Sequence, residues 1–224
     1  LYDHAVRLLR EVEATIEDVQ SVAKGLKGEL KLGFSGSVAF EILPLLLQAS
    51  RTYFPEITIE LAQLTTSEQV KALEYREIDI GILVPPIDNP VIETEPFRIE
   101  EFVVCLPETH PLTQQKVIDI QDLQHESFIM APKHSGVGYY HSIFAIFEDA
   151  GFTPHISQTA NEQLTMVSLV ASGFGVAIVP QSTQAIQIKG VTYRKLAKSY
   201  LKMNSIAWNK HNSRPILLEF LNFI

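Results

Sequence analysis

A serine-rich turn is the first part of the chain whose residues could do chemistry. Gly33-Phe34-Ser35-Gly36-Ser37 follows one apolar segment and precedes another. This pattern is one residue away from the G-x-S-x-G turn that presents a nucleophilic serine between a strand and a helix. Ser37 occupies the position where that turn needs a small residue, and no histidine of the chain has a local catalytic signature. A nucleophilic Ser35 is therefore one of three interpretations.

The other two interpretations need no reaction. Ser35 or Ser37 could cap the following helix by accepting a backbone hydrogen bond. Alternatively, the hydroxyls, the free N–H groups and the positive end of the helix dipole could together bind a carboxylate. Thr65 and Thr66 repeat the arrangement before the next predicted helix, where their spacing to Glu68 also fits a capping box. We favour carboxylate binding at both turns, with capping as the alternative.

Alternating strands and helices must position these turns. Strands are predicted at 30–34, 57–61 and 78–84, with helices at 38–53 and 66–75 between them. Pro44 predicts a kink or break in the first of these helices. The β-α-β-α-β order indicates a parallel sheet covered on both faces. Further strands are predicted at 102–106, 127–130, 155–159, 176–179, 191–194 and 205–208, and further helices at 139–150, 162–171 and the end of the chain.

The fold class that follows is α/β, with two units of similar order. The second unit is inserted into the first, and the strands near Phe102 and Ser205 make the two crossings. The loop Lys133-His134-Ser135-Gly136 follows a strand of the second unit, as the serine turn does in the first. Ligands of such folds bind at the carboxyl ends of strands and in clefts between units. Lys133 and His134 would then add positive charge to the far wall of a cleft, although a simple exposed loop is the alternative.

Composition excludes several classes of function. The net charge is −8, so these residues lack the clustered cations that contact phosphates in nucleic acids. Cys105 is the single cysteine, which excludes an internal disulfide and fits a reducing compartment, so we expect a cytoplasmic protein. No segment has the length of a membrane span, and the first residues lack a secretory signal pattern. We find no metal-ligand spacing and no nucleotide-binding loop, and therefore expect no metal and no cofactor.

The first 27 residues have a different pattern. Apolar residues recur there at alternating spacings of three and four, as in a coiled-coil heptad with one polar position. A coiled coil that joins two subunits and an amphipathic helix packed on its own domain are both open; we favour the coiled coil. The stripe consists of Ala5, Leu8, Val12, Thr15, Val19, Val22 and Leu26.

Four segments together resemble the LysR-type transcriptional regulators. They are "GELKLGFSGSVAFEILPLLLQASRTYFPEITIEL", "VKALEYREIDIGIL", "FVVCLPETHPL" and "VSLVASGFGVAIVP". The resemblance covers essentially the whole chain, as a linker helix plus an effector-binding domain. "GFSGSVAFEILP" and "ASGFGVAIVPQSTQAIQ" are most similar to the members that respond to muconate or benzoate.

The resemblance implies a two-subdomain clamshell related to periplasmic binding proteins. The implied division is a linker helix at 1–27, subdomain I at 28–100 plus 204–224, and subdomain II at 101–203. The implied partners are a small-molecule inducer, a second or further copies of the chain in a dimer or tetramer, and RNA polymerase. Promoter DNA would be bound by a winged helix-turn-helix that this chain lacks, and no membrane is involved.

The resemblance also implies an inducer site between the subdomains. It would involve Ser35, Gly36 and Ser37 in the first turn and Thr65 and Thr66 in the second. The other subdomain would contribute Lys133, His134, Ser135, Tyr139 and Asn161. The 133–138 loop contains more glycine than the muconate-type pattern, which indicates a ligand of different size or shape.

Two rival functions remain at this point. A periplasmic-type solute-binding protein has a related architecture and similar ligand chemistry. An α/β hydrolase would use Ser35 as its nucleophile. The heptad helix argues against the first rival and Ser37 against the second, so we expect a sensor without enzymatic activity.

Overall fold

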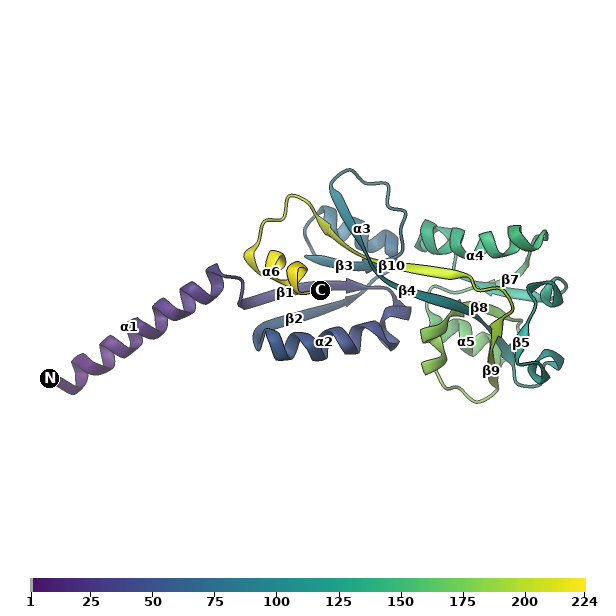
Figure 1. The fold of residues 1–224 in the computed structure, drawn as a ribbon, viewed down its shortest axis with the longest axis horizontal. Helices are drawn as coiled ribbons and strands as arrows, with labels where there is room; N and C mark the ends of the chain where they lie inside the picture. The colour runs from purple at the N-terminus through teal and green to yellow at the C-terminus, as the bar shows by residue number, and fades with distance from the viewer. Residues whose placement is uncertain (1) are drawn as a thin grey trace.

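Two α/β units and one projecting helix make up the molecule, for which we use a computed structural model (Figure 1). The structure describes the backbone of residues 2–224 and the side chains from residue 9 onward. α1 (Tyr2–Ala23) extends away from the first unit, and three residues separate its end from β1 (Lys27–Phe34). Across this described range, no helix is both long and apolar enough to span a lipid bilayer.

The first unit has a parallel core, as predicted. β1 pairs in parallel with β2 (Glu56–Gln63) on one side and with β3 (Ile80–Leu83) on the other. Ile82 packs with α2 (Ile42–Tyr53) and α6 (Pro215–Phe223), whereas its neighbour Leu83 packs with α3 (Thr66–Glu74). Because adjacent residues of a strand point to opposite faces, the helices cover both faces of the sheet.

The predicted helix 38–53 is present in two pieces. A 3₁₀ segment, η1 (Gly36–Phe40), precedes α2, and the helix is interrupted at Glu41 between them. Pro44 is the third residue of α2, where a backbone N–H has no acceptor within the helix. The break that Pro44 predicted is therefore confirmed, and it lies before the proline because proline fits only the first turn.

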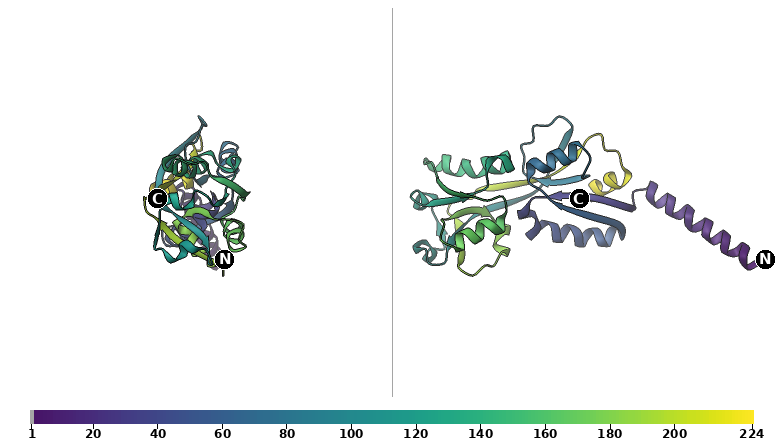
Figure 2. Two further views of the ribbon diagram at one scale, coloured as in Figure 1. Left: turned by 90° about the vertical axis from the view of Figure 1, so that its right-hand side faces the viewer. Right: turned by 180° about the vertical axis from the view of Figure 1, so that it is seen from behind.

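Two long strands connect the units. β4 (Ile92–Pro107) and β10 (Leu201–Asn209) pair antiparallel from Ile92↔Asn209 to Glu101↔Leu201, with a register shift at Asn204/Ser205. β10 also pairs antiparallel with β3, so the sheet of the first unit is mixed rather than purely parallel. Both strands run from one unit into the other (Figures 1 and 2). The boundaries predicted at 100/101 and 203/204 fall inside them.

The second unit is built around the far end of β4. This part of β4 pairs antiparallel with β8 (Ala177–Pro180) and β9 (Val191–Leu196). β5 (Val117–Ile118) pairs in parallel with β9 at the edge of the sheet. β6 (Ser127–Met130) and β7 (His155–Thr159) form a separate parallel pair. The helices are α4 (Val137–Ala150) and α5 (Gln163–Ala171). Four further 3₁₀ segments are η2 (Pro111–Gln114), η3 (Ile120–Leu123), η4 (Lys133–Ser135) and η5 (Gln181–Ala185).

Alternation along β4 divides the core of the second unit between its two helices. Phe102 and Val104 pack in a cluster with α4, whereas Val103 and Cys105 pack with α5. Burial raises the pKa of the Cys105 thiol to about 12, so the side chain stays a neutral thiol. Cys105 is therefore a structural core residue.

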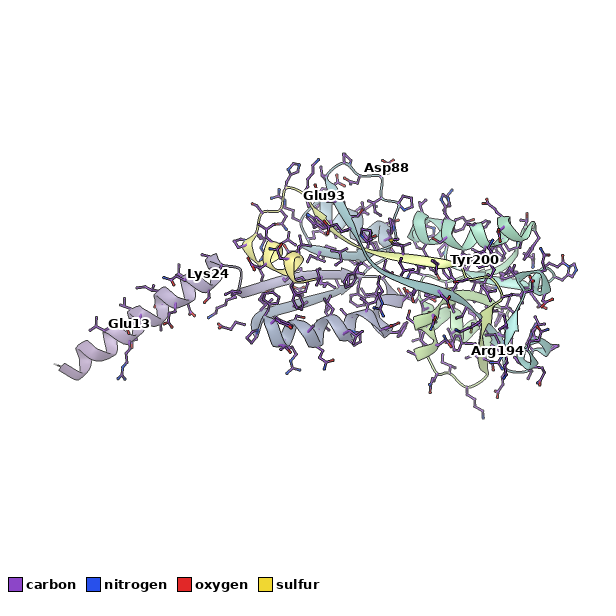
Figure 3. All side chains as sticks on the ribbon, in the orientation of Figure 1. Glu13, Lys24, Asp88, Glu93, Arg194 and Tyr200 are labelled. Atoms are coloured by element: carbon purple, nitrogen blue, oxygen red, sulfur yellow. The ribbon has the colours of Figure 1, made fainter. Side chains whose placement is uncertain are left out.

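The apolar stripe of α1 has no cover from its own chain. Val12 and Val19 are 54% and 63% exposed, and Leu9, Ile16 and Val22 are also exposed. Figure 3 shows the side chains around Glu13, in the middle of α1, with no other element beside them. Ala5 and Leu8 lie outside the described side chains, and Leu26 lies beyond the end of the helix.

Candidate functional site

A small cavity lies where the two units meet. Its volume is about 50 Å³. The first unit lines it with the turns that follow β1, β2 and β3, and the second unit with the loops that follow β6 and β7, which is where an open α/β fold places ligands. The lining residues are Ser35, Gly36, Ser37, Leu64, Thr65, Thr66, Val84, Ala131, Ser135, Gly136, Tyr139, Asn161, Glu162, Gln163 and Lys202.

Eight of the ten predicted site residues line this cavity, and two do not. Lys133 and His134 are exposed, and the Lys133 ammonium lies over the Tyr140 ring, 5.9 Å from its centroid. The reason is the 3₁₀ turn η4, which turns Lys133 and His134 outward and leaves Ser135 to line the cavity. The prediction that these two residues add positive charge to the cavity wall is corrected accordingly.

Ser35 makes the hydrogen bonds of neither a nucleophile nor a helix cap. Ser35 occupies the N-cap position of η1, but its hydroxyl makes no capping hydrogen bond. The Ser35 Oγ is buried and has no hydrogen-bond partner among the residues with described side chains. A nucleophilic serine needs a base within hydrogen-bond reach. Both the hydrolase interpretation and the capping interpretation therefore lack support at Ser35.

Ser37 is the hydroxyl of this turn that has a partner. It is 5% exposed, and its Oγ accepts a hydrogen bond from the Lys202 Nζ at 2.7 Å. Its backbone carbonyl accepts a bond from the Ser182 hydroxyl of the second unit at 3.3 Å. Ser37 thus connects the serine turn to a crossing strand and to the opposite unit.

In the threonine turn, the Thr65 hydroxyl caps α3 and the Thr66 hydroxyl faces the cavity. Thr65 forms the predicted capping box with Glu68: its Oγ1 accepts from the Glu68 N–H at 3.3 Å, and its own N–H donates to the Glu68 carboxylate at 2.8 Å. Hydrogen bonds from the backbone and hydroxyl of Thr65 lower the pKa of Glu68. Thr66 is 7% exposed, and its hydroxyl makes no hydrogen bond to any residue with a described side chain. Thr66 is therefore the threonine that is free to bind a ligand.

Lys202 is the charged residue of the cavity that the sequence did not reveal. It lies on β10 with its side chain fully buried, and its Nζ donates to Ser37 and, at 2.9 Å, to Glu100. The ammonium also lies 5.9 Å from the centroid of the Tyr139 ring. Its neighbours in the sequence, Met203-Asn204-Ser205, match no recognisable motif.

Lys202 and Glu100 form a buried ion pair. Burial lowers the pKa of Lys202, and the carboxylate of Glu100 opposes this effect. Burial alone would raise the pKa of Glu100, but the Lys202 ammonium and hydrogen bonds from Ser182 and Asn204 hold it below its ordinary value. Each group therefore favours the charged form of the other. Because Glu100 lies on β4 and Lys202 on β10, this pair joins the two crossing strands below the cavity.

Side-chain contacts continue from Lys202 around the cavity rim. The Tyr139 hydroxyl accepts from the Gln163 Nε2 at 3.2 Å. The next residue along the chain towards the N-terminus, Glu162, accepts a hydrogen bond from the Gln63 amide of the first unit. On the other side, the Ser135 hydroxyl donates to the Asn161 Oδ1 at 2.7 Å. The sequence analysis did not predict Glu162 and Gln163 as site residues, although they directly follow the predicted Asn161.

Three helices begin at the cavity. They are α3, α4 and α5, whose N-cap residues are Thr65, Gly136 and Glu162. The starts of α4 and α5 have no side-chain cap, so the backbone N–H groups of their first turns are not satisfied by capping side chains. Helix starts carry partial positive charge and favour anions. Throughout the described side chains, no group of three histidine, cysteine or acidic residues could hold a metal ion.

Comparison with known proteins gives a consistent result. The family model described as the LysR substrate binding domain matches residues 23–224. The chain is similar to the HTH-type transcriptional regulator AlsR of Bacillus subtilis, at 35% identity over 98% of this chain and 73% of AlsR. It is also similar to the HTH-type transcriptional regulator BenM of Acinetobacter baylyi, at 30% identity over 86% of this chain and 64% of BenM.

Solved structures share the fold. CbnR, a LysR family transcriptional regulator, superposes with a TM-score of 0.89 at 24% identity, over 98% of this chain and 76% of CbnR. The effector-binding domain of BenM with its effector benzoate gives 0.74 at 30% identity, over 87% and 90% of the two chains. The effector-binding domain of QuiR in complex with shikimate gives 0.81 at 25% identity, over 88% and 95%.

Proposed function

Because the chain belongs to the LysR substrate-binding domain family, we propose that it senses a small carboxylate, such as an aromatic acid, in the cavity between its two units. One observation carries this proposal: the free Thr66 hydroxyl, the Lys202 ammonium and the uncapped starts of α4 and α5 all lie at one cavity. Benzoate and shikimate, which the structures of BenM and QuiR contain, are both carboxylates. The relatives are named as transcriptional regulators, which favours a sensor over a solute-binding protein or an enzyme.

Subdomains I and II, as predicted from the sequence, would move against each other when the effector binds. β4 and β10 are the connections between them, and the Lys202–Glu100 pair joins these strands under the cavity. A ligand changes the balance between two orientations only if it binds one of them more tightly. The change would reach promoter DNA through a winged helix-turn-helix of the whole protein, which would act in the cytoplasm.

Substituting each of the two adjacent threonines separately is expected to distinguish an effect on ligand binding from an effect on stability. Thr66→Val removes a hydroxyl that makes no hydrogen bond to any described side chain or backbone group, so it should weaken carboxylate binding about tenfold and leave stability nearly unchanged. Thr65→Ala removes the cap of α3, so it should cost about 1 kcal/mol of unfolding free energy and leave affinity nearly unchanged. Isothermal titration with benzoate and shikimate, together with urea unfolding, measures both quantities. Equal affinities of Thr66→Val and the parent chain would contradict the role of this hydroxyl.

We further propose that α1 pairs with α1 of a second copy. Its exposed apolar stripe is long and narrow, which suits a two-helix coiled coil. Val12→Asp combined with Val19→Asp should therefore convert a dimer into monomers, because two charges would lie in the seam. Glu13→Ala, which lies off the stripe, is the matched control. Sedimentation velocity reads out the change, and identical sedimentation of the double variant and the parent would refute the pairing.

A further inference from the structure

Glu162 places a carboxylate at the rim of the proposed effector site. It lies at the N-cap of α5, is half-buried, and accepts a hydrogen bond from Gln63 across the cavity mouth. Its Oε2 lies so close to Gly36 that a Cβ atom built there would be 2.7 Å away. The carboxylate is therefore held against the serine turn by shape as well as by hydrogen bonding.

Among the residues with described side chains, one cation and one anion line the cavity. They are Lys202 and Glu162, and Lys202 already shares its ammonium with Glu100. A ligand with a single carboxylate can place it beside Lys202 and the helix starts. A second carboxylate would add a negative charge near Glu162, and like charges at such short range in a partly buried site repel strongly.

The two charges lie at different places on one continuous rim. Ser37 contacts Lys202, and its neighbour Gly36 contacts Glu162. On the opposite wall, Tyr139 lies under the Lys202 ammonium and is bonded to Gln163, which adjoins Glu162. The rim therefore offers a cation, Lys202, that can bind an acid group, and a carboxylate, Glu162, that can accept hydrogen bonds.

We infer that this site selects monocarboxylates that carry a hydroxyl group at their far end and rejects dicarboxylates, with Glu162 as the specificity-determining residue. This inference rests on the proposed function. The effector's carboxylate binds at Lys202, and its hydroxyl donates to Glu162. Because Gln63 donates to the same carboxylate from the first unit, the hydroxyl competes with the contact that joins the two units at the rim.

Matched ligand pairs test the inference by calorimetric titration of the 224-residue chain at low ionic strength, where screening is weak. The pairs are 4-hydroxybutyrate against succinate and 4-(hydroxymethyl)benzoate against terephthalate; each pair exchanges a CH₂OH group for a carboxylate. The parent chain should prefer the hydroxy acid by roughly tenfold. Glu162→Gln keeps the size and the hydrogen bond to Gln63, and should tighten diacid binding by roughly tenfold. Glu148→Gln, at an exposed position on α4, should change neither affinity.

Two results would overturn the inference while the proposed function stands. One is a diacid that binds the parent chain as tightly as its hydroxy partner. The other is an unchanged preference in Glu162→Gln, with circular dichroism showing that the variant is folded. If neither the parent chain nor Glu162→Gln binds any of the four acids, benzoate or shikimate, the proposed function fails and this inference fails with it.

Discussion

A Lys202→Met variant is expected to lose about 3–5 kcal/mol of unfolding free energy at neutral pH. Methionine keeps the length of the side chain but removes the counter-ion of Glu100, whose side chain is 8% exposed. A buried carboxylate without a partner is costly, so the folded state is destabilised. Affinity for a carboxylate effector should fall roughly 100-fold, because the cation at the cavity is also lost. Urea unfolding and isothermal titration measure the two effects.

The stability loss of this variant should depend on pH. In the parent chain the pKa of Glu100 is lowered, so its contribution to stability is present above the ordinary value of 4.5 and is lost as pH falls through the lowered pKa. In the variant only the hydrogen bonds from Ser182 and Asn204 still oppose burial, which is the largest effect, so the pKa of Glu100 should rise. The penalty is then absent below the ordinary pKa and grows as pH rises through the raised one. The deficit measured at pH 7 should therefore shrink as the pH approaches 4.

A double variant separates the two roles of Lys202. Adding Glu100→Gln to Lys202→Met removes the unpaired charge, so most of the stability should return while the affinity stays low. Recovery of affinity in the double variant would show that Lys202 acts only as a structural partner of Glu100. Unchanged stability of the single variant at pH 7 would contradict the buried ion pair itself.

Gly138→Ala is expected to cost about 3 kcal/mol or more of unfolding free energy. Gly138 is the second residue of α4, and a Cβ atom there would lie 2.2 Å from the carbonyl oxygen of Pro85 and 2.6 Å from that of Val84. Both are backbone atoms in the two residues that follow β3, and a backbone carbonyl cannot rotate away as a flexible side chain can. The start of α4 must therefore move off the first unit, which also separates Gly136 from Thr66 and should weaken effector binding.

Gly151→Ala provides the matched control on the same helix. Gly151 follows the end of α4 with a φ of +75°, and no atom lies within 4 Å of a Cβ built there. Alanine should cost only the strain of the left-handed conformation, about 1 kcal/mol. Urea unfolding of the two variants compares a steric clash with backbone strain. Equal costs would show that the contact between α4 and Pro85 does not hold the units together.

Local patterns were sufficient to predict much of the fold. The strands predicted at 127–130 and 155–159 coincide with β6 and β7, and the spacing of Thr65 and Glu68 predicted a capping box that is present. The first half of β4 was missed because Glu93, Glu95 and Arg98 hide its alternation. The antiparallel pairing of β3 with β10 was not predicted either, since pairing between residues about 120 positions apart leaves no local signal in the sequence.

The site was predictable where a turn follows a strand, and not elsewhere. Ser37 and Thr66 stand out because hydroxyl groups at strand-to-helix turns converge in this type of fold. Lys202 enters the cavity from the start of the crossing strand β10, so only the three-dimensional register of β4 and β10 brings it to Ser37. Lys133 and His134 have suitable chemistry, but the 3₁₀ turn directs them outward.

The path of the chain through β10 and α6 determines the order in which the molecule can be completed during synthesis. The second unit consists of one continuous stretch between the crossings, whereas the first unit needs residues from both ends of the chain. Ile206 and Phe220 belong to the same core as Leu30 and Leu32, so that core stays incomplete until β10 and α6 have left the ribosome. Contacts between such distant positions form slowly. The inserted unit can therefore fold first, and the unit that contains β1 is completed after it.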